Sequence, residues 1–230
     1  MKILTIDTST SACSVALTSD DRLIAESLLN VQGHQSTRVM EMVAAVMHGA
    51  GLDIQDIDCF GVALGPGSFT GVRIGVATVK ALALATGKPV AGFSSLAMLS
   101  LNVSHAGVPV CPMFDARKKE IYAALYRMGE VPEPLVGDCV APPALFLERL
   151  SGPVLFLGDG ALAYRHLIED RFGGEALFPD VPCHQPSAAR GASLARQALL
   201  RGEAIPVHSL APVYIRASEA ELAKIRKDAL

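Results

Sequence analysis

The chain has 230 residues, of which 50% are hydrophobic and 19% are charged. This composition supplies enough apolar material for one or two cores and excludes a disordered protein. The 20 Lys and Arg and the 23 Asp and Glu give a net charge of −3, so no global positive field attracts nucleic acid or an anionic membrane.

The N-terminal segment and the spacing of the cysteines narrow the class of protein further. The first ten residues do not build the apolar core of a secretion signal, and no apolar run approaches the roughly 20 residues of a membrane span. We therefore expect a cytoplasmic protein that does not cross a membrane. The five cysteines are isolated and never spaced CxxC, which disfavours a disulfide framework and a zinc knuckle.

The first hundred residues predict three strands followed by alternating helices and strands. The turn residues Asp20 and Asp21 separate the second and third strands, which predicts an antiparallel meander. Glycines end the first helix, and Gly87 ends the second. The order β-β-β-α-β-α-β-α is that of the ribonuclease H-like fold. The expected elements are 2–7, 11–19, 22–30, 36–51, 58–65, 71–87, 89–93 and 94–102.

The same order begins again after residue 103, which predicts a structural duplication. Its expected elements are 108–115, 121–128, 134–141, 142–150, 152–161, 164–172 and 187–202. We predict an N-terminal half, 1–103, and a truncated C-terminal half, 104–230, whose last helix, 216–230, is able to fold back on the first half. The fold class is α/β with two ribonuclease H-like halves, the architecture of the actin, Hsp70 and sugar kinase superfamily.

Asp7 and Asp115 end the first strand of each half, where members of that superfamily clamp ATP phosphates between two hairpins. Such a clamp favours glycine after each aspartate, because a side chain holds the anion away from the backbone N–H groups. The chain instead reads DTSTSA and DARKKE. We treat Asp7, Thr8, Ser9 and Asp115 as vestigial phosphate-loop positions and expect no ATP hydrolysis by this chain alone.

Residues 65–71, GPGSFTG, form a glycine-rich loop before the long helix. The spacing GxGxxxG is one residue too long for the dinucleotide fingerprint, and the loop lacks the lysine of a P-loop. Pro66 and Gly67 predict a sharp exit from the strand, and Ser68 or Thr70 predicts the helix cap. An anion bound at this helix N-terminus stays open as an alternative.

The helix over 71–87 has small residues on much of its surface and only two charges, Arg73 and Lys80. A surface helix normally carries a broad polar face. Two interpretations stay open: the helix is buried inside its own domain, or it pairs with another subunit.

Four segments resemble the bacterial TsaB family, whose members are also called YeaZ. They are ILTIDTST at 3–10, GPGSFTGVRIG at 65–75, GFSSLAML at 92–99 and PVYIR at 212–216. The resemblance runs nearly the full length of the chain, and this combination is far more specific than a glycine loop alone. It implies a role in making N6-threonylcarbamoyladenosine (t6A) at position 37 of tRNAs that read codons beginning with A.

The resemblance also implies partners. In that family the chain is a non-catalytic subunit that dimerises with the catalytic subunit TsaD through N-terminal helices, recruits the ATPase TsaE, and forms homodimers when alone. We expect contact with tRNA only through the complex, and no cofactor on this chain alone, with ATP at or near the partner interface left open. The candidate interface positions are Val39, Val43, Gly71, Val72, Gly75, Val76, Val79 and Lys80.

The interface hypothesis carries its own test. A long charged side chain in place of Gly75 or Val76 is expected to abolish partner binding and to leave the monomer folded. The motivation is the small, weakly charged helix surface, which permits close approach of a second helix.

We expect no catalytic residue and no metal site. TsaD-type subunits carry a histidine pair after the strand that follows the glycine loop, and here that segment, 92–102, contains no histidine. The next histidine, His105, stands alone, and one ligand cannot form a three-ligand site. The chain also lacks an HExxH pattern and a GxSxG nucleophile elbow, so protease activity is not expected.

A second class of function stays open: a self-sufficient ATP-dependent enzyme of the actin and sugar kinase superfamily. The missing glycines and histidines favour the accessory subunit. A standalone RNA-binding module is disfavoured, because the chain is acidic and has no Trp and only four Tyr for stacking bases.

Overall fold

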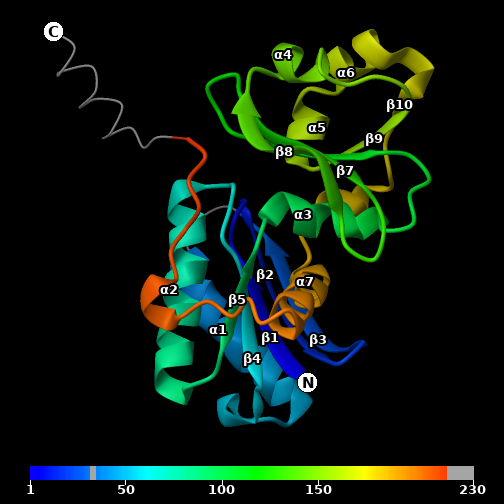
Figure 1. The fold of residues 1–230 in the computed structure, drawn as a ribbon. Coiled ribbons are helices and arrows are strands. Elements are labelled where there is room, and N and C mark those ends of the chain that lie inside the picture. The colour runs from blue at the N-terminus through cyan, green and yellow to red at the C-terminus, as the bar shows by residue number, and fades with distance from the viewer. Residues whose placement is uncertain (32–34, 217–230) are drawn as a thin grey trace, which may run out of the picture.

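A computed structural model describes residues 1–31 and 35–216 of the chain. Two lobes are stacked on each other, each built on a five-stranded mixed sheet (Figure 1). The first sheet contains β1 (Lys2–Asp7), β2 (Ala12–Ser19), β3 (Arg22–Asn30), β4 (Cys59–Ala63) and β5 (Val90–Phe93). The second contains β6 (Val110–Asp115), β7 (Ile121–Arg127), β8 (Glu133–Ala141), β9 (Val154–Leu157) and β10 (Ala176–Leu177).

The strand orders confirm the predicted duplication. The first sheet runs β3-β2-β1-β4-β5 and the second runs β8-β7-β6-β9-β10. In each, the first strand pairs antiparallel with the second and parallel with the fourth. The fold is therefore a pair of ribonuclease H-like sheets, as the order of elements indicated.

Three of the four helices described in the second half of the sequence are short, with eight residues or fewer. The first lobe contributes α1 (Gln35–Ala50), α2 (Phe69–Thr86) and α3 (Ser95–Ser100). The second contributes α4 (Pro143–Leu147), α5 (Asp159–Ala163), α6 (Arg165–Phe172) and α7 (Ala188–Leu200). The predicted truncation of the second half appears in these short helices and in the two-residue β10.

Local signals placed α2 correctly. Ser68 is its N-cap, and the Ser68 hydroxyl accepts a hydrogen bond from the N–H of Gly71. Gly87 ends the helix with φ 71°, the left-handed conformation that glycine adopts without strain. The predicted exit from β4 is also observed, and it contains a cis Gly65–Pro66 peptide bond.

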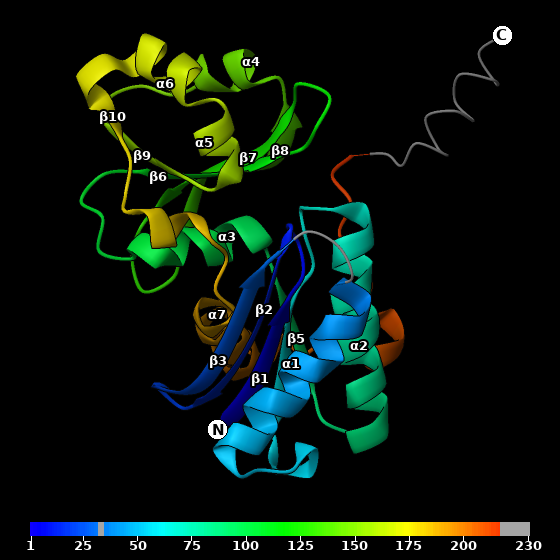
Figure 2. The ribbon, with the colours of Figure 1, turned by 180° about the vertical axis from the view of Figure 1, so that it is seen from behind.

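α3 and α7 lie between the two sheets, and each packs on the sheet of the other half of the sequence (Figures 1 and 2). α7 contacts β1, β2, β4 and β5, and its Ala195 and Ala198 share a core with Ile3. α3 contacts β6 and β7, and its Leu96 and Leu99 share a core with strands of the second sheet. The two halves are thus interlocked by exchanged helices.

The opposite face of the first sheet carries α1 and α2, which lie side by side (Figure 2). Their inward-facing valines and methionines form the largest core of the lobe with strands β1, β2 and β4. α2 is the helix among the described residues that is long and apolar enough to cross a membrane by length and composition. Core helices meet the same criteria, and α2 packs on a sheet.

Residues 203–216, which we call the C-terminal strap, return along the outside of the first lobe beside α2 (Figure 1). The N–H of Ile205 donates to the carbonyl of Val90 at 2.8 Å, and the N–H of Val213 donates to that of Leu64 at 2.8 Å. At its end, the Arg216 guanidinium binds the carbonyl of Ala116 in the second lobe. The predicted helix at 216–230 lies outside the described residues, apart from Arg216 itself.

Candidate functional site

The glycine-rich loop at 65–71 is packed against the turn between β1 and β2. The N–H of Ser68 donates to the carbonyl of Ser9 at 2.6 Å, and the hydroxyl of Thr8 donates to the carbonyl of Gly71 at 2.7 Å. Both turn residues are buried. The loop and the turn therefore form one closed unit held together by the chain's own backbone.

Two glycines make this packing sterically possible. A Cβ atom on Gly67 would collide with the backbone carbonyl of Ser9, and one on Gly75 would come 2.6 Å from the hydroxyl oxygen of Thr8. Side chains at these positions would push the helix away from the turn. The glycines predicted to mark a loop for close approach thus approach another segment of the same protein.

Two N–H groups at the start of α2 already have partners within the chain. The N–H groups of Ser68 and Gly71, which a phosphate would need, already donate to Ser9 and to the Ser68 hydroxyl. Gly67 lies directly on the Ser9 backbone, where an anion would have to enter. These contacts reduce the number of N–H groups that an anion at this helix N-terminus could use, and that alternative stays a prediction.

Asp7 and Asp115 occupy equivalent places and form the same local turn. Oδ1 of Asp7 accepts from the N–H of Ser9 at 3.1 Å, and Oδ1 of Asp115 accepts from the N–H of Arg117 at 2.8 Å. Their surroundings differ, because Asp7 is buried and Asp115 is partly exposed and ion-paired with Arg117 at 3.3 Å. The repeated order of elements in the sequence predicted that these two aspartates occupy equivalent positions.

Burial raises the pKa of the Asp7 carboxyl from 3.8 to about 6, although the hydrogen bond from the N–H of Ser9 lowers it. Among the described residues, Oδ2 of Asp7 and Oγ of Ser9 have no hydrogen-bond partner. The first turn thus holds a buried carboxyl that binds its proton more tightly than an exposed aspartate does.

The turn at 116–120 is the second vestigial loop, and its backbone is unusual. Arg117, Lys118 and Lys119 have φ angles of 61°, 53° and 62°, a region that side chains adopt only at a cost. The Arg216 guanidinium holds this turn by binding the Ala116 carbonyl at 2.7 Å and the Glu120 carboxylate. A charged, strained turn fixed by the strap replaces the glycine turn of a phosphate clamp.

Side chains for metal chemistry are not clustered. Within residues 1–31 and 35–216, no group of three His, Cys, Asp or Glu lies close enough to hold a metal ion. His105 is exposed, and its Nδ1 lies 3.0 Å from the hydroxyl of Ser104. The prediction that the chain has no catalytic residue and no metal stays a prediction.

The predicted interface residues are placed differently from what their pattern suggested. Val39, Val43, Val72, Val76 and Val79 are all less than 6% exposed and belong to the core under α1 and α2. Gly71 and Gly75 are buried as well, and Lys80 is partly exposed. As direct partner contacts, the valines and glycines are corrected. The valines pack in the core with the sheet of their own lobe, and Gly71 and Gly75 lie against Thr8 of the β1–β2 turn.

The proposed test with Gly75 or Val76 fails for the same reason. Gly75 lies on Thr8, and Val76 is 5% exposed, so a long charged side chain at either position would disrupt the monomer. The interface itself stays a prediction. Its test requires residues on the outer face of the same helices.

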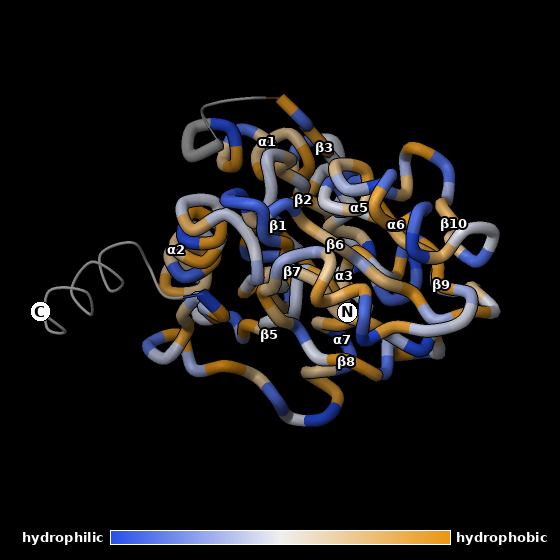
Figure 3. The backbone as a smooth tube through the Cα atoms, turned by 90° about the horizontal axis from the view of Figure 1, so that it is seen from above, coloured by the Kyte–Doolittle hydropathy of each residue, from blue (hydrophilic) through white to orange (hydrophobic). Residues whose placement is uncertain are grey.

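That outer face is mostly apolar, although Glu41, His48 and Arg73 are also exposed on the two helices. Leu84 of α2 is 70% exposed, and Met40 of α1 is 47% exposed. Exposed alanines fill most of the remaining outer positions, and we call the whole set the helical apolar face: Met40, Ala44, Ala45, Ala77, Ala81, Leu84 and Ala85. Seen from above, α2 lies at the outer side of the molecule, with hydrophobic positions along it (Figure 3). Two adjacent helices with small apolar outer residues can approach another helix pair closely.

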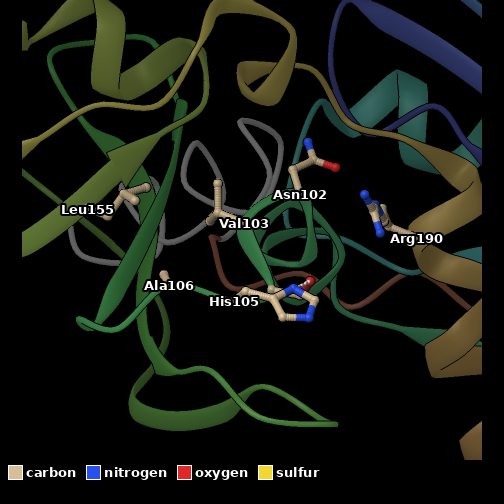
Figure 4. A pocket seen from close by; sticks show the side chains of 7 residues that line it. Asn102, Val103, His105, Ala106, Leu155 and Arg190 are labelled. Atoms are coloured by element: carbon tan, nitrogen blue, oxygen red, sulfur yellow. Dashed lines mark hydrogen bonds between the residues drawn. The ribbon is translucent and has the colours of Figure 1, made fainter.

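A pocket of about 380 Å³ opens where the lobes meet (Figure 4). Its lining is Asn102, Val103, Ser104, His105, Ala106, Leu155 and Arg190. Asn102 donates to the carbonyls of Cys183 and Gln185, which ties the segment after α3 to the segment before α7. Arg190 reaches from α7 toward the side where Asn102 and His105 lie (Figure 4). Sequence patterns missed this pocket, because its residues come together only through the helix exchange.

Comparison with known proteins identifies similar sequences over most of the chain. A family model described as "TsaD: tRNA N6-adenosine threonylcarbamoyltransferase" matches residues 29–224. A Bacillus subtilis protein named "tRNA threonylcarbamoyladenosine biosynthesis protein TsaB" is 36% identical over 225 residues, covering 96% of each chain.

Solved structures agree with this similarity. The structure of YeaZ from Pseudomonas aeruginosa matches with a TM-score of 0.80 and 30% identity, covering 93% of this chain and 99% of that one. A ROK hexokinase from Thermus thermophilus matches with a TM-score of 0.50 and 12% identity, covering 86% and 100% of the two chains. The second likeness shows the fold alone, which is the actin and sugar kinase-like architecture.

Proposed function

The chain belongs to the TsaB (YeaZ) family, and from this membership we propose that it is a non-catalytic subunit in the formation of t6A. In this role it pairs with a TsaD-type catalytic subunit and supports transfer of the threonylcarbamoyl group to adenosine 37 of tRNAs that read codons beginning with A. The observation that carries the proposal is the 36% identity to a TsaB protein over 96% of both chains.

The closed first loop supports a non-catalytic role. The place where the superfamily holds phosphate is filled by contacts of Ser68 and Gly67 with Ser9. The second loop has three cationic side chains and no glycine. Neither loop therefore has the glycine turn that favours a phosphate clamp, which supports a non-catalytic role.

The helical apolar face supports pairing with a TsaD-type subunit. Exposed contiguous apolar residues on two adjacent helices are typical of a surface that another protein covers. The family model that matches this chain describes the TsaD protein itself, so the partner has related helices. Such helices can form a four-helix contact with α1 and α2.

Further partners follow from the same membership as proposals. A TsaE-type ATPase joins the pair, and any ATP lies at or near the partner interface and not on this chain alone. The chain forms a homodimer through the same helices when its partner is absent. tRNA is bound through the assembled complex in the cytoplasm.

The alternative is a self-sufficient ATP-dependent enzyme, and its basis is the fold that the chain shares with a hexokinase. Such an enzyme requires saturable binding of ATP with magnesium to the isolated chain, followed by turnover on an acceptor. The closed loop argues against this alternative.

An omission and add-back assay tests the proposal. The reaction contains tRNA, a supply of threonylcarbamoyl-adenylate, and the TsaD-type and TsaE-type subunits, with and without this chain, and modified adenosine is counted. We expect modification only when the chain is present, and no ATPase activity of the chain alone. Full modification without the chain would overturn the proposal.

A further inference from the structure

We infer that the C-terminal strap forms part of the partner-binding surface, with Tyr214 as an aromatic anchor and Arg73 as a cation that meets a carboxylate of the TsaD-type partner. This inference rests on the proposed function. It extends the contact beyond the two helices to a segment more than 100 residues away in sequence.

The strap is held along α2 before any partner arrives. The Lys80 ammonium donates to the carbonyls of His208 at 3.3 Å and Leu210 at 3.5 Å. Nε of Arg73 donates to the hydroxyl of Tyr214 at 2.6 Å. Because the strap is also bound to Leu64 and to the second lobe, its side chains have little freedom left to lose on binding.

The end of the strap forms a compact aromatic and cationic cluster. The rings of Phe69 and Tyr214 are 5.0 Å apart, and the Arg73 guanidinium lies 3.7 Å from the centre of the Phe69 ring. Phe69 is 39% exposed, Val213 is 53% exposed, and Tyr214 is 45% exposed. Pre-ordered Tyr and Arg side chains at an apolar surface are the residue types that dominate binding energies.

The cluster continues the helical apolar face. Phe69 and Arg73 lie on the first turns of α2. Ala77 follows four residues after Arg73, Ala81 four residues after Ala77, and Leu84 three residues after Ala81. These spacings place the residues on one side of the helix. The strap thus adds its exposed Val213 and Tyr214 beside the N-terminal end of the outer side of α2.

The charges select the kind of partner. α1 and α2 together carry three cations, Arg38, Arg73 and Lys80, and one carboxylate, Glu41, for a local charge of 3 − 1 = +2 in a chain of net charge −3. In the part of the chain that the structure describes, neither Arg73 nor Lys80 has an ion pair. A partner with carboxylates at the rim complements these cations, so it should bind more tightly than a second copy of this surface, which brings like charges together.

Affinity measurements by calorimetry between the full chain and a purified TsaD-type subunit test the inference. We expect Tyr214→Ala and Arg73→Gln each to weaken binding at least tenfold, and Tyr214→Phe, which keeps the ring, to weaken it less than Tyr214→Ala. Matched controls are Val181→Ala, which removes a 78% exposed side chain elsewhere, and Arg171→Gln, which also lies beside a ring, that of Phe172. Both controls should bind within twofold of the unmodified chain.

Salt separates recognition from a purely structural role. If Arg73 meets a carboxylate, affinity of the unmodified chain falls with added salt more steeply than that of Arg73→Gln. Equal salt dependence, or strap variants that bind within twofold, would overturn the inference, and so would strap variants that weaken only self-association.

Failure of the proposed function has a different signature. In that case the unmodified chain does not bind the TsaD-type subunit at all. If it does bind, and Leu84→Glu on the helical apolar face abolishes binding while Tyr214→Ala does not weaken it, only the role of the strap is refuted.

Discussion

The hydroxyl of Thr8 donates to the carbonyl of Gly71 across 63 positions of sequence, at 2.7 Å. This bond joins the β1–β2 turn to the first turn of α2, at the place where related folds hold phosphate. The close approach of the turn explains why the loop is glycine-rich. It also makes the loop a determinant of stability.

Substituting Gly67 with alanine should therefore destabilise the protein. The new Cβ meets the backbone of Ser9, which has no alternative position, so we expect a loss of about 1–3 kcal/mol in the free energy of unfolding. Urea denaturation measures the change. Gly49→Ala in α1 is the control, because nothing lies within 4 Å of its new Cβ, and it should be neutral or stabilising by up to about 1 kcal/mol. Equal stability of the Gly67 variant and the original protein would refute the closed-loop packing.

Asp7 predicts a pH dependence of stability. Its pKa is 3.8 when exposed and about 6 in the folded chain, so the folded state binds the proton more tightly than the unfolded state. The contribution of Asp7 to the free energy of unfolding is fully present below pH 3.8 and is lost as the pH rises through about 6. The loss is at most roughly 3 kcal/mol, since each pKa unit corresponds to about 1.4 kcal/mol.

Replacing this carboxyl should flatten that pH dependence. Asp7→Asn should be more stable than the unmodified chain at pH 8, and the difference should disappear near pH 4, as measured by unfolding in urea at each pH. Asp21→Asn, at a 90% exposed carboxylate, is the control. A constant difference between Asp7→Asn and the unmodified chain from pH 4 to 8 would contradict the raised pKa.

The helical apolar face predicts a matched pair of charge substitutions. Leu84 of α2 is 70% exposed and Leu200 of α7 is 71% exposed, so glutamate at either position should leave the monomer folded. Only Leu84→Glu is expected to abolish self-association and binding to the TsaD-type subunit, because it alone places a charge in the proposed contact. Light scattering after gel filtration reports the oligomeric state. Equal behaviour of the two variants would exclude α2 as the interface.

A hydrogen-bond network joins the lobes and predicts a third stability effect. The carboxylate of Asp138 in β8 accepts from the hydroxyls of Ser94, at the start of α3, and Tyr126 in β7. Asp138→Ala leaves the buried Tyr126 hydroxyl without this acceptor and should cost about 2 kcal/mol or more. Glu133→Ala, which breaks an exposed pair with Arg127 at 2.8 Å, should cost less than about 1 kcal/mol. Thermal unfolding distinguishes the two, and similar losses would count against the network.

Local patterns predicted most of the fold. Alternation and turn residues placed the β1–β3 meander, and Ser68 and Gly87 gave both ends of α2. The strand predicted over 152–161 was too long, because β9 ends at Leu157 and α5 begins at Asp159. The helix predicted over 164–172 is α6, and Tyr164 leaves the helical conformation between α5 and α6. β10 was missed, since two residues carry no detectable alternation.

The candidate site was less predictable, for a physical reason. Helical spacing finds the apolar face of a helix, and for α2 that face with Val72, Val76 and Val79 packs on its own sheet. The outer face consists largely of alanines, which are neutral in such a pattern. The strap has no periodicity at all, so its contacts with Arg73 and Lys80 are visible only in three dimensions.

The exchange of α3 and α7 also affects how the chain folds during its synthesis. One face of the first sheet is covered by α7, so residues 2–93 are synthesised long before the segment at 188–200 that completes their core. Neither lobe is a self-contained folding unit, and a nascent chain exposes an apolar sheet face until nearly all of it has left the ribosome. A fragment ending at residue 103 should therefore aggregate, whereas the same fragment supplied with the remaining chain has its missing layer restored.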